Sequence, residues 1–302
     1  MVGTGDDCAV VAPSLGSAFA VTTDTLVEGR HFLPTIDPFK LGRRVVHVNL
    51  SDLAAMGAKP RYALLSLTLP AINEAWIAKF SEGLWAALDQ FGVELIGGNT
   101  TRGPLAVAMT AMGEVPAGEA ILRSGAKVGD EVWVSGPLGD AGWALYCLMG
   151  DIKADASASQ IAKYECPEAR VALGMALRGI ATSCIDISDG LLSEAAHLAA
   201  ASGVTLSINF ASIPTSLNEP LASGEYRAKA RHCLLSTGDA YELLFTVPAA
   251  CHAVVAELLR SGGLSGACIG EVIAPDATAG VRVLDAQSRP MAIDIKGWDH
   301  FA

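Results

Sequence analysis

The stretch Ser183–Ala201, which reads SCIDISDGLLSEAAHLAAA, indicates the fold class. Its first residues, Ser183–Ile187, are mostly apolar and resemble a buried strand. A short polar loop follows, and Leu191–Ala201 then has the apolar spacing of a helix. A strand, a polar loop and a helix in this order form the repeating unit of an α/β (α+β) protein.

The same alternation continues on both sides of this stretch. Strands are expected at Cys8–Ala12, Phe19–Thr25, Tyr62–Leu69, Glu94–Gly97, Leu105–Glu114, Glu131–Ser135, Thr205–Phe210 and Leu243–Val247, with a hairpin over residues 280–295. Helices are expected between Asp37 and Gly57 and over Asn73–Phe91 and Cys251–Arg260. A shift to Gly-rich composition after Glu114 predicts two domains, residues 1–118 and 119–302, and residues 151–166 are expected to form a surface connection.

Composition excludes several classes of protein. Hydrophobic residues make up 51% of the 302 residues and charged residues 18%, so a sizeable core can form and disorder is excluded. The net charge of −11 would repel nucleic acid or a free polyphosphate unless cations intervene. Seven scattered cysteines without a CxxC pair argue against a disulfide framework and for a reducing compartment. No apolar run approaches the roughly 20 residues of a membrane span, so a cytoplasmic protein is expected.

Acidic residues recur at the ends of apolar strands or on apolar helix faces. They occur in the segments Gly5-Asp6-Asp7, Thr22-Thr23-Asp24, Asn49–Asp52, Asp186–Asp189 and Gly238-Asp239. A buried carboxylate without a partner costs several kcal/mol. Each of these groups therefore requires a cation nearby or a solvated position.

Asp52 follows the apolar stripe Leu41, Val45 and Val48, so helical spacing places its carboxylate on the buried face. Two explanations remain open for it. It is a metal ligand, or it is satisfied within the core by water or by a nearby basic residue (Arg43, Arg44 or Lys59).

The segment Asp186-Ile187-Ser188-Asp189-Gly190 lies between an expected strand and an expected helix. Ser188 or Asp189 could simply cap the helix. Capping does not explain Asp186, which strand alternation places on the same face as Ser188. Because phosphate and metal sites are built at such junctions, we expect a functional site here.

Gly97–Gly103 reads GGNTTRG and is expected to be a glycine-rich turn after a strand. Its glycines would let the backbone approach a phosphate, and Asn99 could bind a cation through its amide oxygen, although a plain β-turn is the alternative. No GxxxxGK[ST] motif is present, which excludes a Walker-type nucleotide site. Together, the Asp, Thr and Asn oxygens suit Mg²⁺ and predict a magnesium- and phosphate-dependent enzyme.

Eight segments, in order, carry a family resemblance. They are GTGDDCAVV, TTDTLVEGRHF, VNLSDLAAMGAKP, IGGNTTRGP, ILRSGAKVGDEVWVSGPLGDA, IDISDGL, STGDAYELLF and GWDHF. From residue 3 to residue 301 the chain resembles the thiamine-monophosphate kinase family of the PurM-like superfamily. The resemblance implies a two-domain PurM-like fold and a homodimer, in which the N-terminal domain forms a dimeric β-barrel and carries the ATP and metal site. It also implies direct in-line transfer of a phosphoryl group from ATP to thiamine monophosphate, giving thiamine diphosphate, with several Mg²⁺ ions.

The resemblance also implies roles for individual residues. The metal-ligand positions are Asp7, Thr22, Thr23, Asp24, Asp52, Asn99, Asp186 and Asp189. The nucleotide positions are Gly98, Asn99, Arg123 and Ser188, and the substrate positions are His31, Asp239 and Trp298. Without the resemblance, Arg123 would be interpreted as a solvated side chain, Trp298 as a packing residue and His31 as an ordinary surface or core histidine.

The chain also departs from the family pattern. Asn99 replaces an aspartate, Asp239-Ala240 replaces Glu-Asp, and Ser81 stands where an aromatic residue against the adenine is expected. The family usually has a further segment before the Gly-Asp-Asp motif, so a missing N-terminal segment is expected.

Two alternatives to a thiamine-monophosphate kinase remain. They are another PurM-like ATP-dependent enzyme, or a catalytically silent nucleotide- or thiamine-phosphate-binding protein. Among the other PurM-like enzymes, selenophosphate synthetase requires a lysine near a reactive N-terminal cysteine, and no lysine precedes Lys40 here. The hydrogenase-maturation dehydratase carries a C-terminal acceptor cysteine, and this chain ends without one.

Overall fold

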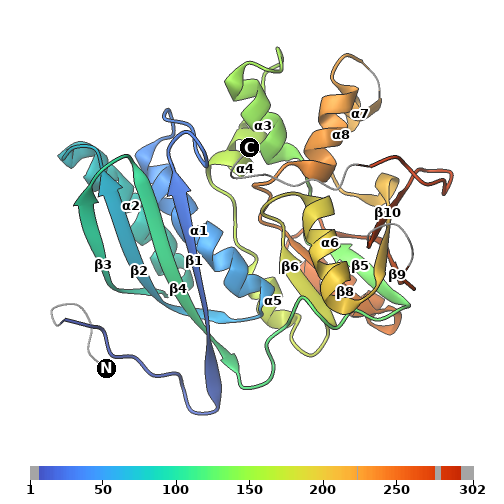
Figure 1. Ribbon diagram of the computed structural model, residues 1–302, viewed down its shortest axis with the longest axis horizontal. Helices are drawn as coiled ribbons and strands as arrows, with labels where there is room; N and C mark the ends of the chain where they lie inside the picture. The colour runs from blue at the N-terminus through green and yellow to red at the C-terminus, as the bar shows by residue number, and fades with distance from the viewer. Residues whose placement is uncertain (1–6, 223, 276–279, 294–302) are drawn as a thin grey trace. The chain divides into compact units, whose positions relative to one another are not determined.

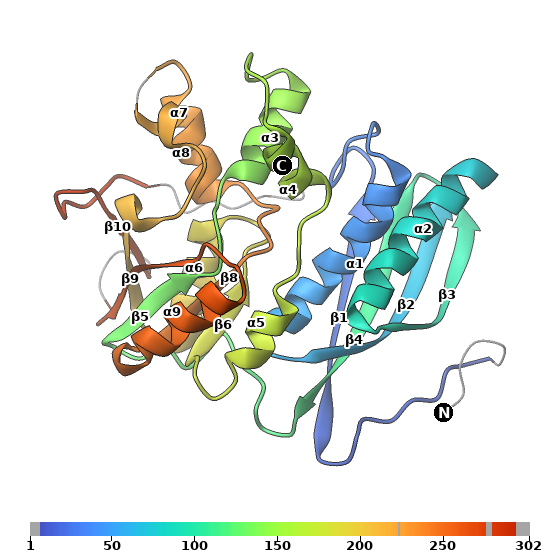
Figure 2. The same ribbon diagram turned by 180° about the vertical axis from the view of Figure 1, so that it is seen from behind.

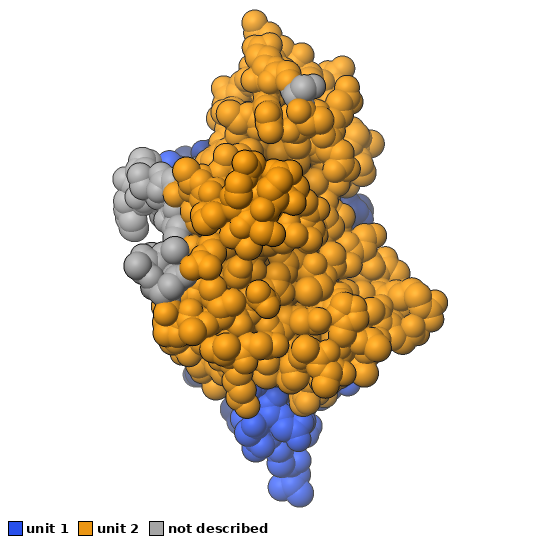
Figure 3. Space-filling view, turned by 90° about the vertical axis from the view of Figure 1, so that its right-hand side faces the viewer, with its two compact units in different colours: residues 1–120, 165–171 blue, residues 121–164, 172–302 orange. Residues whose placement is uncertain are grey.

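The computed structural model describes residues 7–222, 224–275 and 280–293. The chain divides into two compact units (Figure 3). The first unit comprises Met1–Ala120 and Glu165–Val171, and the second comprises Ile121–Tyr164 and Ala172–Ala302. The short segment Glu165–Val171 thus belongs to the first unit although the chain on both sides of it belongs to the second.

The first unit contains a four-stranded sheet with the order β1-β4-β2-β3. The strands are β1 (Ser17–Val27), β2 (Lys59–Leu69), β3 (Glu94–Arg102) and β4 (Ala106–Pro116). The β2–β3 pair is parallel, whereas β4 pairs antiparallel with β1 and β2. The helices α1 (Pro38–Ala55) and α2 (Glu74–Phe91) lie together on one face of this sheet (Figures 1 and 2). Among the described residues no further strand pairs with its two edges, β1 and β3, so the sheet does not close into a barrel within this part of the chain.

Both helices begin at the caps that the sequence predicts. The Asp37 side chain accepts a hydrogen bond from the Phe39 amide at 2.9 Å, and the Asn73 side chain accepts one from the Trp76 amide at 3.1 Å. Helix α2 ends at Gly92, whose φ of 64° lies in the left-handed region that glycine adopts readily. Capping and apolar spacing therefore set the limits of these helices.

The second unit contains a six-stranded mixed sheet with the order β10-β7-β9-β5-β8-β6. The strands are β5 (Asp130–Val134), β6 (Ser183–Asp186), β7 (Thr205–Asn209), β8 (Leu243–Pro248), β9 (Ala267–Ile273) and β10 (Val281–Leu284). The helices are α3 (Asp140–Met149), α4 (Ala158–Glu165), α5 (Val171–Ala176), α6 (Leu191–Ser202), α7 (Asn218–Ala222), α8 (Arg227–Ser236) and α9 (His252–Ser261). Helix α6 lies in front of the sheet in Figure 1 and α9 lies in front of it in Figure 2, so the two cover opposite faces. Apolar side chains of α6, among them Leu192, Leu198 and Ala199, form the main core with the sheet.

Two predictions of local structure are wrong. Cys8–Ala12 forms no strand, since Val10 is 61% exposed and these residues have no core face to cover. The expected turn at Gly97–Gly103 is instead a continuation of β3 to Arg102, because β2 supplies a parallel partner along this length. The surface connection expected at 151–166 is mostly exposed or half-buried, and it also contains α4, in which the Ser157 hydroxyl accepts a hydrogen bond from the Gln160 amide at 3.2 Å.

The other expected helices and strands are present to within a few residues. The hairpin expected over 280–295 is found in part. Strand β10 pairs in parallel with β7, and the chain then turns so that the Met291 amide bonds to the Val283 carbonyl at 2.8 Å. The two units and their sheets make up an α/β fold.

Candidate functional site

In the first unit, polar side chains of α1 face strand β1. The Thr22 hydroxyl donates a hydrogen bond to Asp52 Oδ2 at 2.5 Å. The Asp24 amide donates to Asn49 Oδ1 at 3.1 Å, and Asn49 Nδ2 donates to the Val45 carbonyl at 2.8 Å. Helix α1 thus brings two side-chain groups to β1 beside the predicted ligands Thr22 and Asp24.

Basic residues do not account for Asp52. Within the described residues Asp52 forms no ion pair, and Arg43 instead bonds to Gln90 at 3.0 Å. Arg44 points elsewhere, because its Nη2 donates to the His31 carbonyl at 3.1 Å. The salt-bridge interpretation of Asp52 is therefore wrong for the described part of the chain.

Two other predicted ligands of this unit lie apart from that group. The Thr23 hydroxyl faces the opposite side of the sheet and donates to the Met109 carbonyl at 3.1 Å. Asn99 lies on β3, the far edge of the sheet, where the register places it on the same face as Thr23. Three strand spacings separate β1 from β3, which amounts to roughly 14 Å. Gly98 beside it has no room for a side chain, since a Cβ there would lie 1.9 Å from the Leu65 carbonyl oxygen.

His31 lies in the loop after β1 and is half-buried. Its Nδ1 accepts a hydrogen bond from the Val27 amide at 3.1 Å, and its carbonyl is held by Arg44, which is 1% exposed. The backbone and one ring nitrogen of His31 are thereby fixed. Asp7, by contrast, is exposed and lies outside any regular element.

In the second unit, Asp186 is buried at the end of β6, and Ser188 and Asp189 are half-buried in the loop that follows. Helix α6 begins at Leu191, and its N-cap position is Gly190, which has a φ of 123° and no side chain that could form a cap hydrogen bond. Neither Ser188 nor Asp189 therefore occupies the N-cap position of this helix.

Glu194 is a site residue that the sequence did not single out. It is 2% exposed, and its Oε1 accepts a hydrogen bond from the Asp189 amide at 3.1 Å. Burial raises the pKa of the Glu194 carboxyl to about 8, and the negative charges of Asp189 and Asp186 add to the shift. Its Oε2 is buried and has no hydrogen-bond partner among the described residues. Its position among the apolar residues of α6 is the signal that could have revealed it.

Asp239 lies in a loop that is bonded to the loop of Asp186. The Asp239 amide donates to the Ser188 carbonyl at 2.9 Å, and the Tyr241 amide donates to the Ile187 carbonyl at 2.8 Å. The second unit therefore brings Asp186, Ser188, Asp189 and Asp239 to adjoining loops.

The two remaining predicted residues are Arg123 and Trp298. Arg123 is exposed, and its carbonyl accepts a hydrogen bond from the Ser202 hydroxyl at 3.2 Å. Trp298 lies outside the described residues.

Comparison with known proteins decides the family. Two family models match the chain, the AIR synthase related protein N-terminal domain over residues 5–115 and its C-terminal domain over residues 127–282. The thiamine-monophosphate kinase of Escherichia coli strain K12 is 42% identical over 304 residues, which cover 100% of this chain and 92% of that protein. The chain belongs to the thiamine-monophosphate kinase family.

Two solved structures support the fold of this thiamine-monophosphate kinase family member. Thiamine-monophosphate kinase from Stenotrophomonas maltophilia K279a is 41% identical with a TM-score of 0.85, covering 94% of this chain and 90% of that one. AaThiL complexed with AMPPCP and TMP is 30% identical with a TM-score of 0.80, covering 96% and 89% of the two chains. The two-domain PurM-like α/β fold implied by the resemblance is confirmed.

The oxygen ligands predicted for a member of the thiamine-monophosphate kinase family suit Mg²⁺. No group of three or more His, Cys, Asp and Glu side chains that could hold a metal ion occurs within the residues that the structure describes. Such a group is not required, because Mg²⁺ is commonly held by one or two carboxylates together with waters and substrate phosphates. The Thr22–Asp52 pair in one unit and the Asp186–Asp189 loop in the other supply hard oxygen atoms of this kind. Of the described helices, none is long and apolar enough to cross a membrane.

Proposed function

We propose that this chain phosphorylates thiamine monophosphate to thiamine diphosphate, using ATP and Mg²⁺, by direct in-line phosphoryl transfer. The observation that carries the proposal is 42% identity to a thiamine-monophosphate kinase along the whole chain. A relative of 30% identity that has been solved with AMPPCP and TMP supports the choice of nucleotide and acceptor. The oxygen-rich loops of both units provide the chemistry that the transfer needs.

The metal ligands proposed in the first unit are Asp7, Thr22, Thr23, Asp24, Asp52 and Asn99, and those in the second unit are Asp186 and Asp189. Thr23 would contribute through its backbone, because its hydroxyl faces the other side of the sheet from Thr22. Mg²⁺ held by these oxygens would offset the charge of the transferring phosphate and of a protein with a net charge of −11.

The residues of the chain mainly bind and orient the two substrates. Gly98, Asn99, Arg123 and Ser188 are proposed to contact ATP, and His31, Asp239 and Trp298 to contact thiamine monophosphate. Arg123 is exposed and can place its planar guanidinium against phosphate oxygens. In the transfer, an acceptor phosphate oxygen bonds to the γ-phosphorus while the bond from that phosphorus to the bridging oxygen of ADP breaks. The acceptor oxygen is already ionised at neutral pH, so no general base is needed and positioning dominates.

We further propose two domains, an N-terminal domain over residues 1–118 that binds ATP and metal and a C-terminal domain over residues 119–302. We propose that the protein is a homodimer, in which the N-terminal domains of the two chains together form a β-barrel. The sheet of the first unit has helices on one face and two open edges, as such pairing requires. Its edges carry different parts of the proposed site, Asp24 on β1 and Asn99 on β3. A second copy that joined these edges would place the strand of Asn99 in one chain beside the strand of Asp24 in the other, with the two side chains on opposite faces of the joined sheet.

Localisation in the cytoplasm is part of the same proposal. All seven cysteines are free, and Cys184 and Cys233 are buried, which suits a reducing compartment.

The proposed reaction is tested by incubating the protein with ATP, Mg²⁺ and thiamine monophosphate and separating the products by chromatography. We expect thiamine diphosphate and ADP, with no product when EDTA is added. Asn99 in place of aspartate favours one alternative, a protein that binds nucleotide without turnover. Binding of ATP and Mg²⁺ without product would support that alternative and contradict the proposed reaction.

A further inference from the structure

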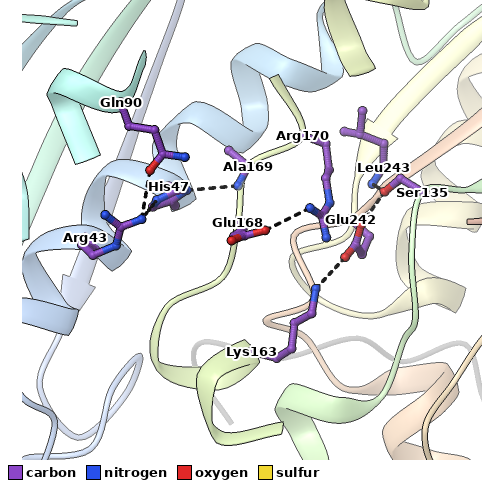
Figure 4. A network of polar contacts seen from close by, with 10 residues as sticks. All are labelled: Arg43, His47, Gln90, Ser135, Lys163, Glu168, Ala169, Arg170, Glu242 and Leu243. Carbon is purple, nitrogen blue, oxygen red and sulfur yellow. Dashed lines mark hydrogen bonds and ion pairs between the residues drawn. The ribbon is translucent and has the colours of Figure 1, made fainter. Parts of the chain in front are cut away.

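Glu242 is a buried carboxylate directly before β8, with a side chain that is 1% exposed. Lys163 Nζ on α4 lies 3.0 Å from Glu242 Oε1, and the Ser135 hydroxyl donates to Glu242 Oε2 at 2.6 Å (Figure 4). The Ser135 oxygen in turn accepts a hydrogen bond from the Leu243 amide at 2.8 Å. A Cβ at Gly136 would lie 2.7 Å from the Glu242 carboxyl group, so the backbone closes around this group. Both carboxylate oxygens are therefore held.

The backbone of Glu242 ends the loop that carries Asp239. The Glu242 carbonyl accepts a hydrogen bond from the Ile187 amide at 2.8 Å. Next to it, the Tyr241 and Asp239 amides bond to the Ile187 and Ser188 carbonyls. The loop from Gly238 to Glu242 is thus fixed along its length to the loop that follows β6.

This loop is conformationally strained. Asp239 has a φ of 66° and Tyr241 a φ of 48°, and these are two of the three non-glycine residues with positive φ in the described part of the chain. Such a backbone conformation is unfavourable for a residue with a side chain, and it persists only where its surroundings hold it. The Lys163 side chain is 29% exposed and that of Glu242 is 1% exposed, so a partly solvated lysine reaches the buried carboxylate and offsets its charge.

We infer that Lys163, Glu242 and Ser135 form a positioning network that holds the loop of Asp239 in its strained conformation, so that Asp239 can contact the thiamine-phosphate acceptor. The role of Asp239 as an acceptor contact rests on the proposed function. The holding of the loop rests on the hydrogen bonds and the ion pair described above, independently of the reaction. The three network residues act through Asp239 and do not themselves contact the substrate.

The holding of the loop is tested by hydrogen exchange in the absence of substrate. In Lys163→Met, the amides of Asp239 and Tyr241 are expected to exchange about 10-fold faster than in the wild type. Lys153→Met, at an exposed lysine of the same unit, is the matched control and is expected to leave these amides unchanged. If Lys163→Met does not fold, Glu242→Gln and Ser135→Ala serve in its place. Wild-type exchange at both amides in a folded variant would overturn the inference.

The role toward the acceptor is tested by kinetics. Lys163→Met is expected to raise the KM for thiamine monophosphate about 10-fold or more while the KM for ATP changes little, and Lys163→Arg is expected to restore most of the loss. In an Asp239→Ala background, Lys163→Met should have almost no further effect on this KM. Equal changes in both KM values, or additive effects of the two substitutions, would overturn the inference. A wild-type protein that does not turn over thiamine monophosphate would instead contradict the proposed function and leave the exchange result standing.

Discussion

Thr22 on β1 donates its hydroxyl hydrogen to Asp52 on α1 over 2.5 Å, which joins two residues that are 30 positions apart in the chain. Because the hydroxyl hydrogen is used in this bond, the Thr22 oxygen and the second Asp52 oxygen remain to accept or to bind a cation. The pair fixes the Asp52 carboxylate toward the strand that also carries Asp24. The relationship explains why an acidic residue occurs in the apolar stripe of α1.

Asp52→Asn and Asp24→Asn are expected to lower the rate of phosphoryl transfer at least about 100-fold, because each removes a charge that the proposed metal site requires. Steady-state assays at saturating Mg²⁺ measure the effect, and circular dichroism checks the fold. Asp89→Asn, at an exposed position of α2, is the matched control. Full turnover by either site variant would contradict the metal assignment.

Asn99→Asp restores the carboxylate usual in the family. We expect it to reduce the Mg²⁺ concentration for half-maximal activity several-fold, since added ligand charge strengthens binding of a hard cation. A Mg²⁺ titration of activity measures the change, with Asn218→Asp on α7 as a control for added charge at an exposed position. An unchanged midpoint would show that Asn99 does not ligate the metal.

A shared site predicts complementation between subunits. Asp24→Asn and Asn99→Lys proteins are each expected to be inactive, because one loses a ligand and the other places a cation at the site. If Asn99 serves the partner's site, purified mixed dimers regain about half of wild-type activity, since each has one intact site of two. Co-expression with two affinity tags permits the measurement. No recovery in the purified mixed dimers would place both residues in a site of one chain.

His47 makes stability depend on pH. The His47 side chain is fully buried, and its Nδ1 accepts a hydrogen bond from the Ala169 amide at 3.2 Å (Figure 4). Burial lowers the pKa of His47 from 6.5 to about 4, and the positive charges of Arg43 and Arg170 add to the shift. Between these values the unfolded chain binds the proton and the folded chain does not. Stability is therefore full above pH 6.5 and falls as the pH drops toward 4, by on the order of 3 kcal/mol.

Denaturant unfolding at pH 4.5 and pH 7 checks this dependence. His47→Gln should show a smaller loss of stability at the lower pH than the wild type, whereas His197→Gln, at an exposed position of α6, should retain the wild-type loss. Equal losses in the wild type and in His47→Gln would exclude His47 as the source.

Local signals in the sequence were sufficient for part of the fold. The caps at Asp37 and Asn73 and the apolar spacing behind them predict α1 and α2, because a helix forms from contacts within one segment. The extension of β3 through Asn99 to Arg102 could not be predicted in this way. It depends on a parallel partner, β2, whose pairing is a long-range contact.

The same difference applies to the candidate site. Asp52 and Asp186 stand out because a carboxylate follows an apolar pattern. Glu242 does not stand out, because its importance comes from Ser135, which is 107 positions away, and from Lys163 on another helix. Glu194 was missed for a similar reason, since its bond to the Asp189 amide depends on how the loop before α6 folds.

The measurement that tests the proposed reaction most directly follows the γ-phosphate itself. With ATP labelled with ³²P in the γ position, Mg²⁺ and thiamine monophosphate, we expect the label in the terminal phosphate of thiamine diphosphate, in amounts equal to the ADP formed. Label released as inorganic phosphate, with thiamine monophosphate left unchanged, would contradict direct transfer to this acceptor.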